Sequence, residues 1–202
     1  MRLLLSGGGD PEFVVPLDEL FASQIGPGKP VLYIPVAMEP HIFTYDQCHA
    51  WFLETYRPYG IEHIEMCTDL ACAQDLEQYT AVYIGGGNTF KLLKAMKESH
   101  FDAKLTAYLR GGGLAYGGSA GALIFGQTIR STHDVNDAGL ADLSGLNLLG
   151  GRDVWAHYRE DEAARIEAYG SDLYILYEES GLFIQDGKIE SVGKPYLEKV
   201  RT

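Results

Sequence analysis

Three short apolar segments of this sequence each run directly into a cluster of glycines. The segments are residues 2–6, 81–84 and 114–116, and the glycines after them occupy 7–9, 85–87 and 117–118. Short, almost continuously apolar runs are typical of strands that are buried on both faces of a sheet. The chain is therefore expected to contain a sheet with both faces covered.

Further strands and helices alternate with these three segments. We expect strands at 30–36, 61–67 and 173–177, short strands at 128–132 and 153–156, and helices at 11–25, 44–56, 69–78, 89–109 (broken near His100) and 160–168. Residues 181–192, around Asp186-Gly187, predict a C-terminal β-hairpin. The alternation predicts an α/β fold with a doubly wound, mostly parallel sheet. Ligands of such sheets bind beyond the carboxyl ends of the strands, so all three glycine loops should lie at one edge.

The composition limits the classes of partner. A chain of 202 residues suits a single domain spanning 1–202. The formal net charge of −12 argues against nucleic acid and anionic membranes. The three cysteines, Cys48, Cys67 and Cys72, form no disulfide framework or zinc signature, so we expect a cytoplasmic protein without a metal or other cofactor. No apolar run approaches the roughly 20 residues that a membrane helix needs.

The third glycine cluster belongs to residues 117–121, which follow a Gly-x-Ser-x-Gly pattern between a strand and small helix-forming residues. This pattern is typical of a nucleophile elbow, a sharp turn that presents the hydroxyl of Ser119. A Cβ atom at Gly117 or Gly121 would crowd such a turn. The N–H groups at the start of the next helix, with its positive dipole end, would stabilise an oxyanion. The pattern also fits a glycine-rich turn with an incidental serine.

A serine nucleophile needs a base, commonly a histidine that a carboxylate orients. His133 and His157 follow the serine, and His157 ends the apolar run 154–156, while His41 in a loop stays open as a candidate. The carboxylates near expected strand ends are Asp134, Asp137, Asp153, Glu178 and Glu179. The order Ser119, Asp134, His157 also fits an esterase of the α/β-hydrolase type. A non-catalytic domain that holds a small anion in its glycine loops is a further alternative.

Two glycine motifs in this order resemble those of one known family. They are Ile84-Gly85-Gly86-Gly87-Asn88-Thr89-Phe90 and Gly117-Gly118-Ser119-Ala120-Gly121-Ala122, with further matches at 6–9, 128–134 and 156–158. Over most of its length the chain resembles the peptidase E (aspartyl dipeptidase) and cyanophycinase family of serine peptidases. The resemblance implies a flavodoxin-like fold, like that of class I glutamine amidotransferases. It also implies a homodimeric serine exopeptidase that hydrolyses short peptides through an acyl-enzyme.

Carried onto this sequence, the resemblance implies Ser119 as the nucleophile and His157 as the base. The third member is either Asp134, soon after the serine, or Glu179, late in the chain, with Glu178 one residue away. We favour Glu179, because a carboxylate at a strand end beside a histidine at a strand end is easily held rigid. The residues implied in oxyanion and substrate binding are Gly86, Gly87, Asn88 and Ala120.

The segment after His157 departs from the pattern of the family. Its members carry basic residues there, in a helix that recognises a substrate aspartate. This chain instead has acidic residues at 160–162, and Glu162 falls about where a key arginine is expected. A carboxylate there would repel an aspartyl side chain. We therefore expect a dipeptidase-like enzyme, and the residues leave an Asp-Xaa specificity open.

Overall fold

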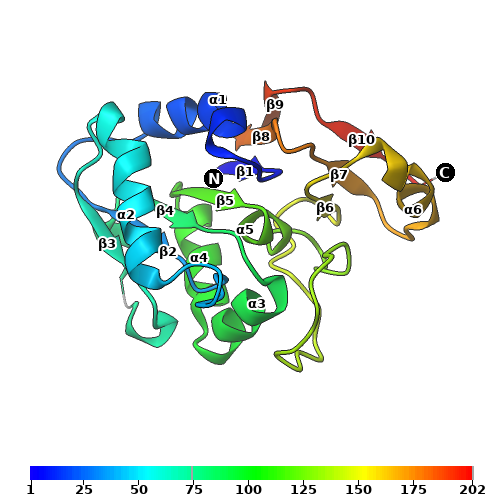
Figure 1. Cartoon of the computed structure of the whole chain (residues 1–202), viewed down its shortest axis with the longest axis horizontal. Coiled ribbons are helices and arrows are strands. Elements are labelled where there is room, and N and C mark those ends of the chain that lie inside the picture. Colours follow the sequence, from blue (N-terminus) through cyan, green and yellow to red (C-terminus); the bar gives the residue numbers. More distant parts are fainter. Residues whose placement is uncertain (74, 202) are drawn as a thin grey trace.

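The computed structural model describes residues 1–73 and 75–201, and its centre is a seven-stranded sheet (Figure 1). The strand order is β3-β2-β4-β5-β1-β8-β9, in which β3 to β1 are parallel and β8 and β9 form an antiparallel hairpin at one edge. The strands are β1 (Arg2–Ser6), β2 (Val31–Ile34), β3 (Ile64–Met66), β4 (Ala81–Ile84), β5 (Leu114–Gly118), β8 (Ser180–Gln185) and β9 (Lys188–Gly193). The expected α/β fold class, with its C-terminal hairpin, is confirmed.

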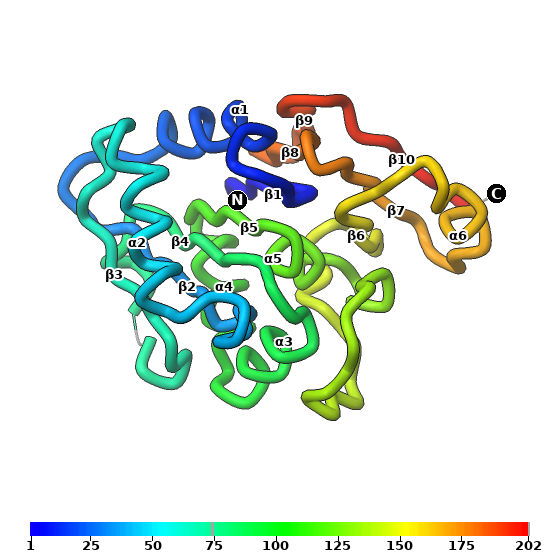
Figure 2. The backbone as a smooth tube through the Cα atoms, in the orientation of Figure 1, coloured from blue at the N-terminus to red at the C-terminus, as the bar shows by residue number. Residues whose placement is uncertain are grey.

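Helices cover both faces of this sheet (Figures 1 and 2). The helices are α1 (Pro11–Ser23), α2 (Tyr45–Tyr56), α3 (Thr89–Glu98), α4 (Phe101–Arg110), α5 (Ala120–Leu123) and α6 (Ala163–Ala168). Successive side chains of a strand point to opposite faces, so β1 contributes to two cores. Leu4 packs in the core with Phe21 of α1 and Phe52 of α2. Leu3 and Leu5 belong to the core of the other face, with α3, α4 and α5.

A smaller sheet lies beside the hairpin, at the end of the molecule where the C-terminus is found (Figure 2). Its order is β10-β7-β6, and its strands are β6 (Asp153–Trp155), β7 (Leu173–Ile175) and β10 (Leu197–Lys199). Trp155, Leu173 and Ile175 pack with Ile166 of α6 into a separate small core. This sheet matters for the site because residue 157 follows β6 and residue 178 follows β7.

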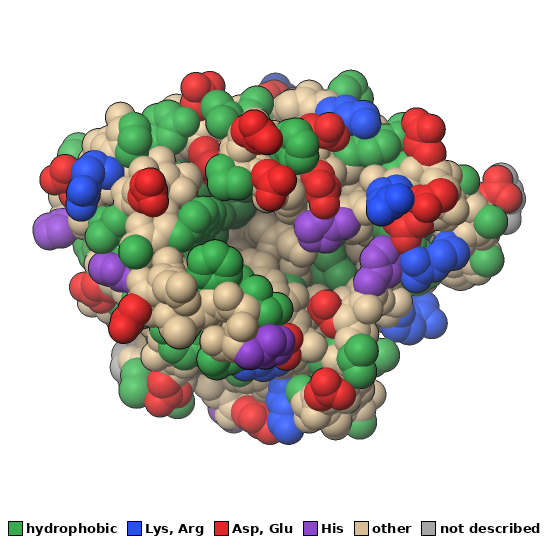
Figure 3. All heavy atoms as spheres, in the orientation of Figure 1, with side chains coloured by type: hydrophobic (Ala, Val, Ile, Leu, Met, Phe, Trp, Pro, Cys, Tyr) green, Lys and Arg blue, Asp and Glu red, His purple; other side chains and the backbone are tan. Residues whose placement is uncertain are grey.

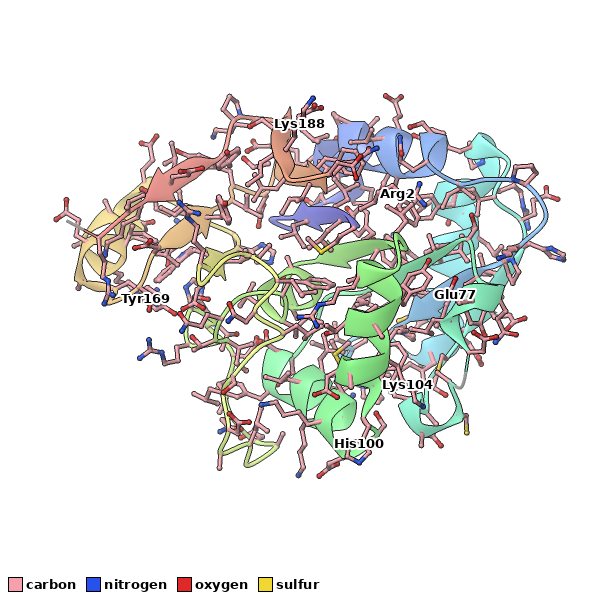
Figure 4. All side chains as sticks on the ribbon, turned by 180° about the vertical axis from the view of Figure 1, so that it is seen from behind. Arg2, Glu77, His100, Lys104, Tyr169 and Lys188 are labelled. Atoms are coloured by element: carbon pink, nitrogen blue, oxygen red, sulfur yellow. The ribbon has the colours of Figure 1, made fainter. Side chains whose placement is uncertain are left out.

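Some local predictions were wrong. In place of the helix expected at 69–78, Leu70–Cys72 and Leu76–Gln78 form two 3-10 turns, and residue 74 lies outside the described residues. The side chains of Asp69 and Asp75 each accept a backbone N–H two residues on, which favours such turns over a helix. The expected strand at 128–132 is reduced to one bridge between Thr128 and Ser144. The break near His100 is confirmed, since this residue has a left-handed backbone (φ 56°) between α3 and α4. Figure 4 labels His100 in a view from behind.

The fold brings the three glycine loops together. Strands β4, β5 and β1 are adjacent and parallel, so their carboxyl ends meet at one edge of the sheet. The N–H of Ser119 donates to the carbonyl of Ser6 at 3.1 Å, and a Cβ on Gly86 would lie 3.4 Å from Cβ of Ser119. Within 1–73 and 75–201, no helix combines the length and the apolar character that crossing a membrane requires.

Candidate active site

Ser119 lies at a sharp turn between β5 and α5. Its backbone has φ 51° and ψ −111°, a strained conformation for a residue with a side chain. The turn closes so tightly that a Cβ on Gly117 would lie 2.2 Å from the carbonyl oxygen of Gly121. A Cβ on Gly121 would in turn lie 2.3 Å from the carbonyl oxygen of Ile84. Only glycine fits at either position, which is the crowding expected of a nucleophile elbow.

The structure brings the hydroxyl of Ser119 against the ring of His157. Ser119 Oγ and His157 Nε2 are 2.7 Å apart. His157 follows β6 and has a positive φ of 54°, and its N–H donates to the carbonyl of Gly7 at 3.0 Å. The first glycine loop therefore fixes the backbone of the histidine, and the elbow presents the serine to it.

The carboxylate on the other side of the ring comes from Glu178. Its Oε1 lies 3.0 Å from His157 Nδ1. The structure does not bring Glu179, the residue expected here, to the ring: its carboxylate lies 3.7 Å from Nζ of Lys194. Glu178 and Glu179 lie in a tight turn after β7, in which the N–H of Ser180 donates to the carbonyl of Tyr177. Because neighbouring side chains of a turn point in different directions, only one of the two carboxylates meets the histidine.

The glycines after β1 pack directly against His157 and Glu178. A Cβ on Gly8, where φ is +90°, would lie 2.3 Å from Cε1 of His157. A Cβ on Gly9 would lie 2.8 Å from Cβ of Glu178. This loop allows close approach of the histidine and the carboxylate, a role that the sequence alone did not reveal.

The residues expected at the oxyanion site lie close to the serine. Gly87 and Ala120 line the same cleft as Ser119, and within 1–73 and 75–201 neither of their N–H groups donates to a protein acceptor. Helix α5 has only four residues, so its individual N–H groups, and not a long helix dipole, are what an oxyanion would meet. The side chain of Asn88 caps α3 by accepting from Lys91 N–H, and its amide donates to the carbonyl of Val135.

Asp134, the other candidate for the third member, has different partners. Its Oδ2 accepts from the N–H of Thr89 at 2.7 Å, from the hydroxyl of Thr89 at 2.6 Å and from the hydroxyl of Thr132 at 2.8 Å. The structure therefore shows Asp134 joining the start of α3 to the loop at 131–137.

His133 and Glu162 form a second pair beside the site. His133 Nε2 lies 3.2 Å from Oε1 of Glu162, and the same carboxylate accepts from Arg165 at 2.7 Å and from the indole N–H of Trp155 at 3.3 Å. The side chain of Glu162 is only 12% exposed. Its charge is thus engaged by neighbouring donors. Another candidate base, His41, is exposed and lies 3.9 Å from Glu39.

A cleft of about 550 Å³ opens at Ser119 and His157 and extends over the loop at 131–137. The side chains of Glu39, Asp134 and Asp137 line it, and no Lys or Arg is among its described lining residues. We call this cavity the polar cleft. Figure 3 shows the face of the molecule hollowed near its centre, with acidic and histidine side chains along one side of the hollow. In the described part of the chain, no three His, Cys, Asp or Glu side chains gather as metal ligands would.

The fold and this geometry are those of α/β proteins with a nucleophile elbow. The chain belongs to peptidase family S51, whose family model matches residues 2–193. Membership agrees with the resemblance that the two glycine motifs carry.

Curated relatives in this family bear the name peptidase E. The chain is 32% identical over 131 residues to the peptidase E of Salmonella arizonae, and the match covers 65% of this chain and 55% of that protein. It is 31% identical over 129 residues to the peptidase E of Escherichia coli (strain K12 / DH10B), covering 64% and 56%. The matched part thus spans little more than half the length of either relative.

Two solved structures have a similar fold. A protein of Listeria monocytogenes EGD-e that bears the name peptidase E superposes with a TM-score of 0.76 at 23% identity, covering 96% of this chain and 98% of that one. A peptidase from an acI-B1 Actinobacterium superposes with a TM-score of 0.64 at 18% identity, covering 98% and 93%. Both likenesses concern the fold.

Proposed function

We propose that this chain is a serine exopeptidase of the dipeptidase type, which hydrolyses short peptides through an acyl-enzyme on Ser119. The observation that carries the proposal is the line of contacts from Ser119 Oγ through His157 to Glu178, at 2.7 and 3.0 Å. A serine, a histidine and a carboxylate in this sequence of contacts can act as nucleophile, base and orienting acid. The curated relatives that bear the name peptidase E support the same class of reaction.

In the proposed reaction, His157 Nε2 accepts the proton of the Ser119 hydroxyl as Oγ attacks the peptide carbonyl carbon. The carbonyl oxygen becomes an oxyanion, to which the N–H groups of Gly87 and Ala120 donate. The protonated His157 then gives its proton to the leaving amine, and the C–N bond breaks. Water attacks the resulting ester by the same route, with His157 again as base. The carboxylate of Glu178 accepts the Nδ1–H of the ring and stabilises the imidazolium.

The charges of the polar cleft bear on which peptide is cleaved. An aspartyl side chain there would meet the carboxylates of Glu39, Asp134 and Asp137, with no Lys or Arg among the described lining residues. Like charges at short range disfavour binding. We therefore propose that the enzyme does not require an aspartate as the N-terminal residue of its substrate.

A panel of dipeptides tests this proposal. We expect release of free amino acids by the wild-type chain, and losses of about 10³-fold or more in kcat for Ser119→Ala and for His157→Ala. The same panel with p-nitrophenyl esters separates a peptidase from an esterase. Hydrolysis of esters without hydrolysis of any dipeptide would favour an esterase, and no hydrolysis of either would favour an anion-binding domain. Asp134 accepts hydrogen bonds from Thr89, and the carboxylate at His157 Nδ1 is that of Glu178, which supports the peptidase over an esterase that uses Ser119, Asp134 and His157.

A further inference from the structure

A second cavity, of about 500 Å³, opens at the same two residues. Ser119 and His157 line it as they line the polar cleft, but this cavity extends toward α1 and α2. Its walls come from Val14 of α1 and Trp51 of α2, together with Met38 and Phe43 from the segment between β2 and α2. We call it the apolar pocket. In Figure 3, hydrophobic side chains line the side of the central hollow that faces α2.

Buried aromatic rings form one wall of the apolar pocket. Tyr33, Tyr83 and Tyr116 line it, and each is at most 5% exposed. The rings of Tyr83 and Tyr116 stack with centroids 4.4 Å apart, and Trp51 lies 6.2 Å from Tyr83. Rings fixed in this way present a rigid surface for an apolar group.

The charge of the apolar pocket differs from that of the polar cleft. Among the described residues that line the pocket, Asp10 is the only carboxylate and none is Lys or Arg. Tyrosine hydroxyls are uncharged at neutral pH, and burial raises the pKa of Tyr83 and of Tyr116 further above the usual range. The two cavities that meet at Ser119 therefore differ in chemistry: one offers carboxylates and the other offers aromatic and aliphatic surface.

The two sides of the scissile bond of a dipeptide differ in the same way. The residue that acylates the serine carries a free α-ammonium, which is costly to bury in an apolar cavity and favourable near carboxylates. The residue that leaves brings its side chain and an α-carboxylate, which the carboxylates of the polar cleft would repel. Charge thus assigns the acyl residue to the polar cleft and the side chain of the leaving residue to the apolar pocket.

We infer that this enzyme is selective for peptides in which a large apolar or aromatic residue follows the scissile bond. The inference rests on the proposed function and names the substrate class of the same site. Burying a leucine or phenylalanine side chain against Trp51 and the tyrosines removes apolar surface from water, whereas glycine offers none to bury. We expect kcat/KM about 10- to 100-fold higher for Xaa-Leu and Xaa-Phe than for Xaa-Gly, with the same Xaa.

The primary experiment measures kcat/KM for Xaa-Gly, Xaa-Leu and Xaa-Phe, with Ala, Asp and Lys in turn as Xaa. Trp51→Ala is expected to reduce the preference for Leu and Phe over Gly by about tenfold, and Trp51→Phe to restore most of it. Phe43→Ser, at an exposed position of the pocket, is expected to reduce the preference without the risk of unfolding. Its matched control is Val15→Ser, a similarly exposed position outside the lining of the pocket, which should keep the wild-type preference.

A second measurement does not depend on turnover. Free leucine and phenylalanine are expected to slow the labelling of Ser119 by a fluorophosphonate, whereas glycine at equal concentration does not. Equal kcat/KM for Gly, Leu and Phe as leaving residues, in an enzyme that cleaves dipeptides at Ser119, would overturn this inference and leave the proposed function intact. Absence of Ser119-dependent hydrolysis of every dipeptide overturns the proposed function, and this inference with it.

Discussion

His157 Nδ1 lies 3.0 Å from Oε1 of Glu178, while the next residue, Glu179, directs its carboxylate to Lys194. Two adjacent residues of the same type thus have different environments at the end of one strand. Only the first touches the histidine that touches Ser119. This difference provides a matched pair of variants for the proposed mechanism.

Glu178→Gln is expected to lower kcat by about 10²- to 10⁴-fold, because an amide NH₂ toward Nδ1 favours the wrong tautomer and leaves the imidazolium without a counter-charge. Steady-state hydrolysis of a dipeptide checks this. Glu179→Gln is the control and is expected to stay within a few-fold of wild type, since its exposed ion pair with Lys194 is weak. A larger loss in Glu179→Gln than in Glu178→Gln would contradict the assignment.

Gly8→Ala is expected to displace the ring of His157, because the new Cβ would lie 2.3 Å from Cε1. A shift of about 1 Å in a base can cost about 10²-fold in rate, so kcat should fall by at least that factor. Gly28→Ala is the control, with a similar φ of +96° and no atom within 4 Å of the new Cβ. Both variants place an alanine at a positive φ, so thermal denaturation should show a similar loss of stability in each. Only Gly8→Ala should also lose activity, which steady-state kinetics would show.

Asp134→Ala is expected to lower the free energy of unfolding and to have a smaller effect on kcat. The substitution leaves the buried Thr89 without the acceptor of its N–H and hydroxyl, at a cost of about 1–3 kcal/mol in the free energy of unfolding. Urea denaturation measures this loss, and Asp137→Ala, at an exposed neighbouring position, should show little of it. An unchanged free energy of unfolding, with kcat reduced as far as in Glu178→Gln, would make Asp134 the orienting acid instead.

Asp18 gives the fold a pH-dependent component of stability. Burial raises the pKa of its carboxyl to about 6, although the hydroxyl of Tyr56 donates to it at 2.5 Å. Because this pKa lies above the unfolded value of about 3.9, the folded state binds more protons between about pH 4 and 6. The contribution of Asp18 to stability is therefore present below pH 4 and is lost as the pH rises to about 6.

Asp18→Asn removes this titration and keeps an acceptor for Tyr56. The free energy of unfolding of the variant, minus that of wild type, should grow by about 2 kcal/mol from pH 4 to pH 7, since one pKa unit corresponds to about 1.4 kcal/mol and the unfolded carboxyl is already half ionised at pH 4. Urea denaturation at several pH values gives this difference directly. A difference that stays constant with pH would show that Asp18 has the same pKa in the folded and in the unfolded state.

The sequence predicted those features that local patterns encode. An apolar run followed by glycines is a local signal, so the strands β1, β4 and β5 and their common edge could be anticipated. The elbow at Ser119 could likewise be predicted, because a Gly-x-Ser-x-Gly pattern after a strand is itself a local signal for such a turn. The residues alone left His41, His133 and His157 open as the base, and the family resemblance selected His157, which the structure brings within 2.7 Å of the serine hydroxyl.

Other features depend on contacts that no local pattern encodes. Whether Glu178 or Glu179 meets the histidine is decided by the dihedral angles of one turn after β7. The packing of Gly8 on His157 joins residues about 150 positions apart in the chain. The apolar pocket likewise combines Val14, Trp51 and Tyr116, which come together only when both helices cover the sheet.

Reaction of the folded chain with a fluorophosphonate, followed by peptide mass spectrometry, shows whether Ser119 is an activated nucleophile. We expect a single adduct on Ser119, absent from Ser119→Ala and formed at least about 10²-fold more slowly in His157→Ala. Circular dichroism of each sample establishes that the chains compared are folded. A folded wild-type chain in which Ser119 stays unmodified would show that Ser119 is not the nucleophile of a serine peptidase.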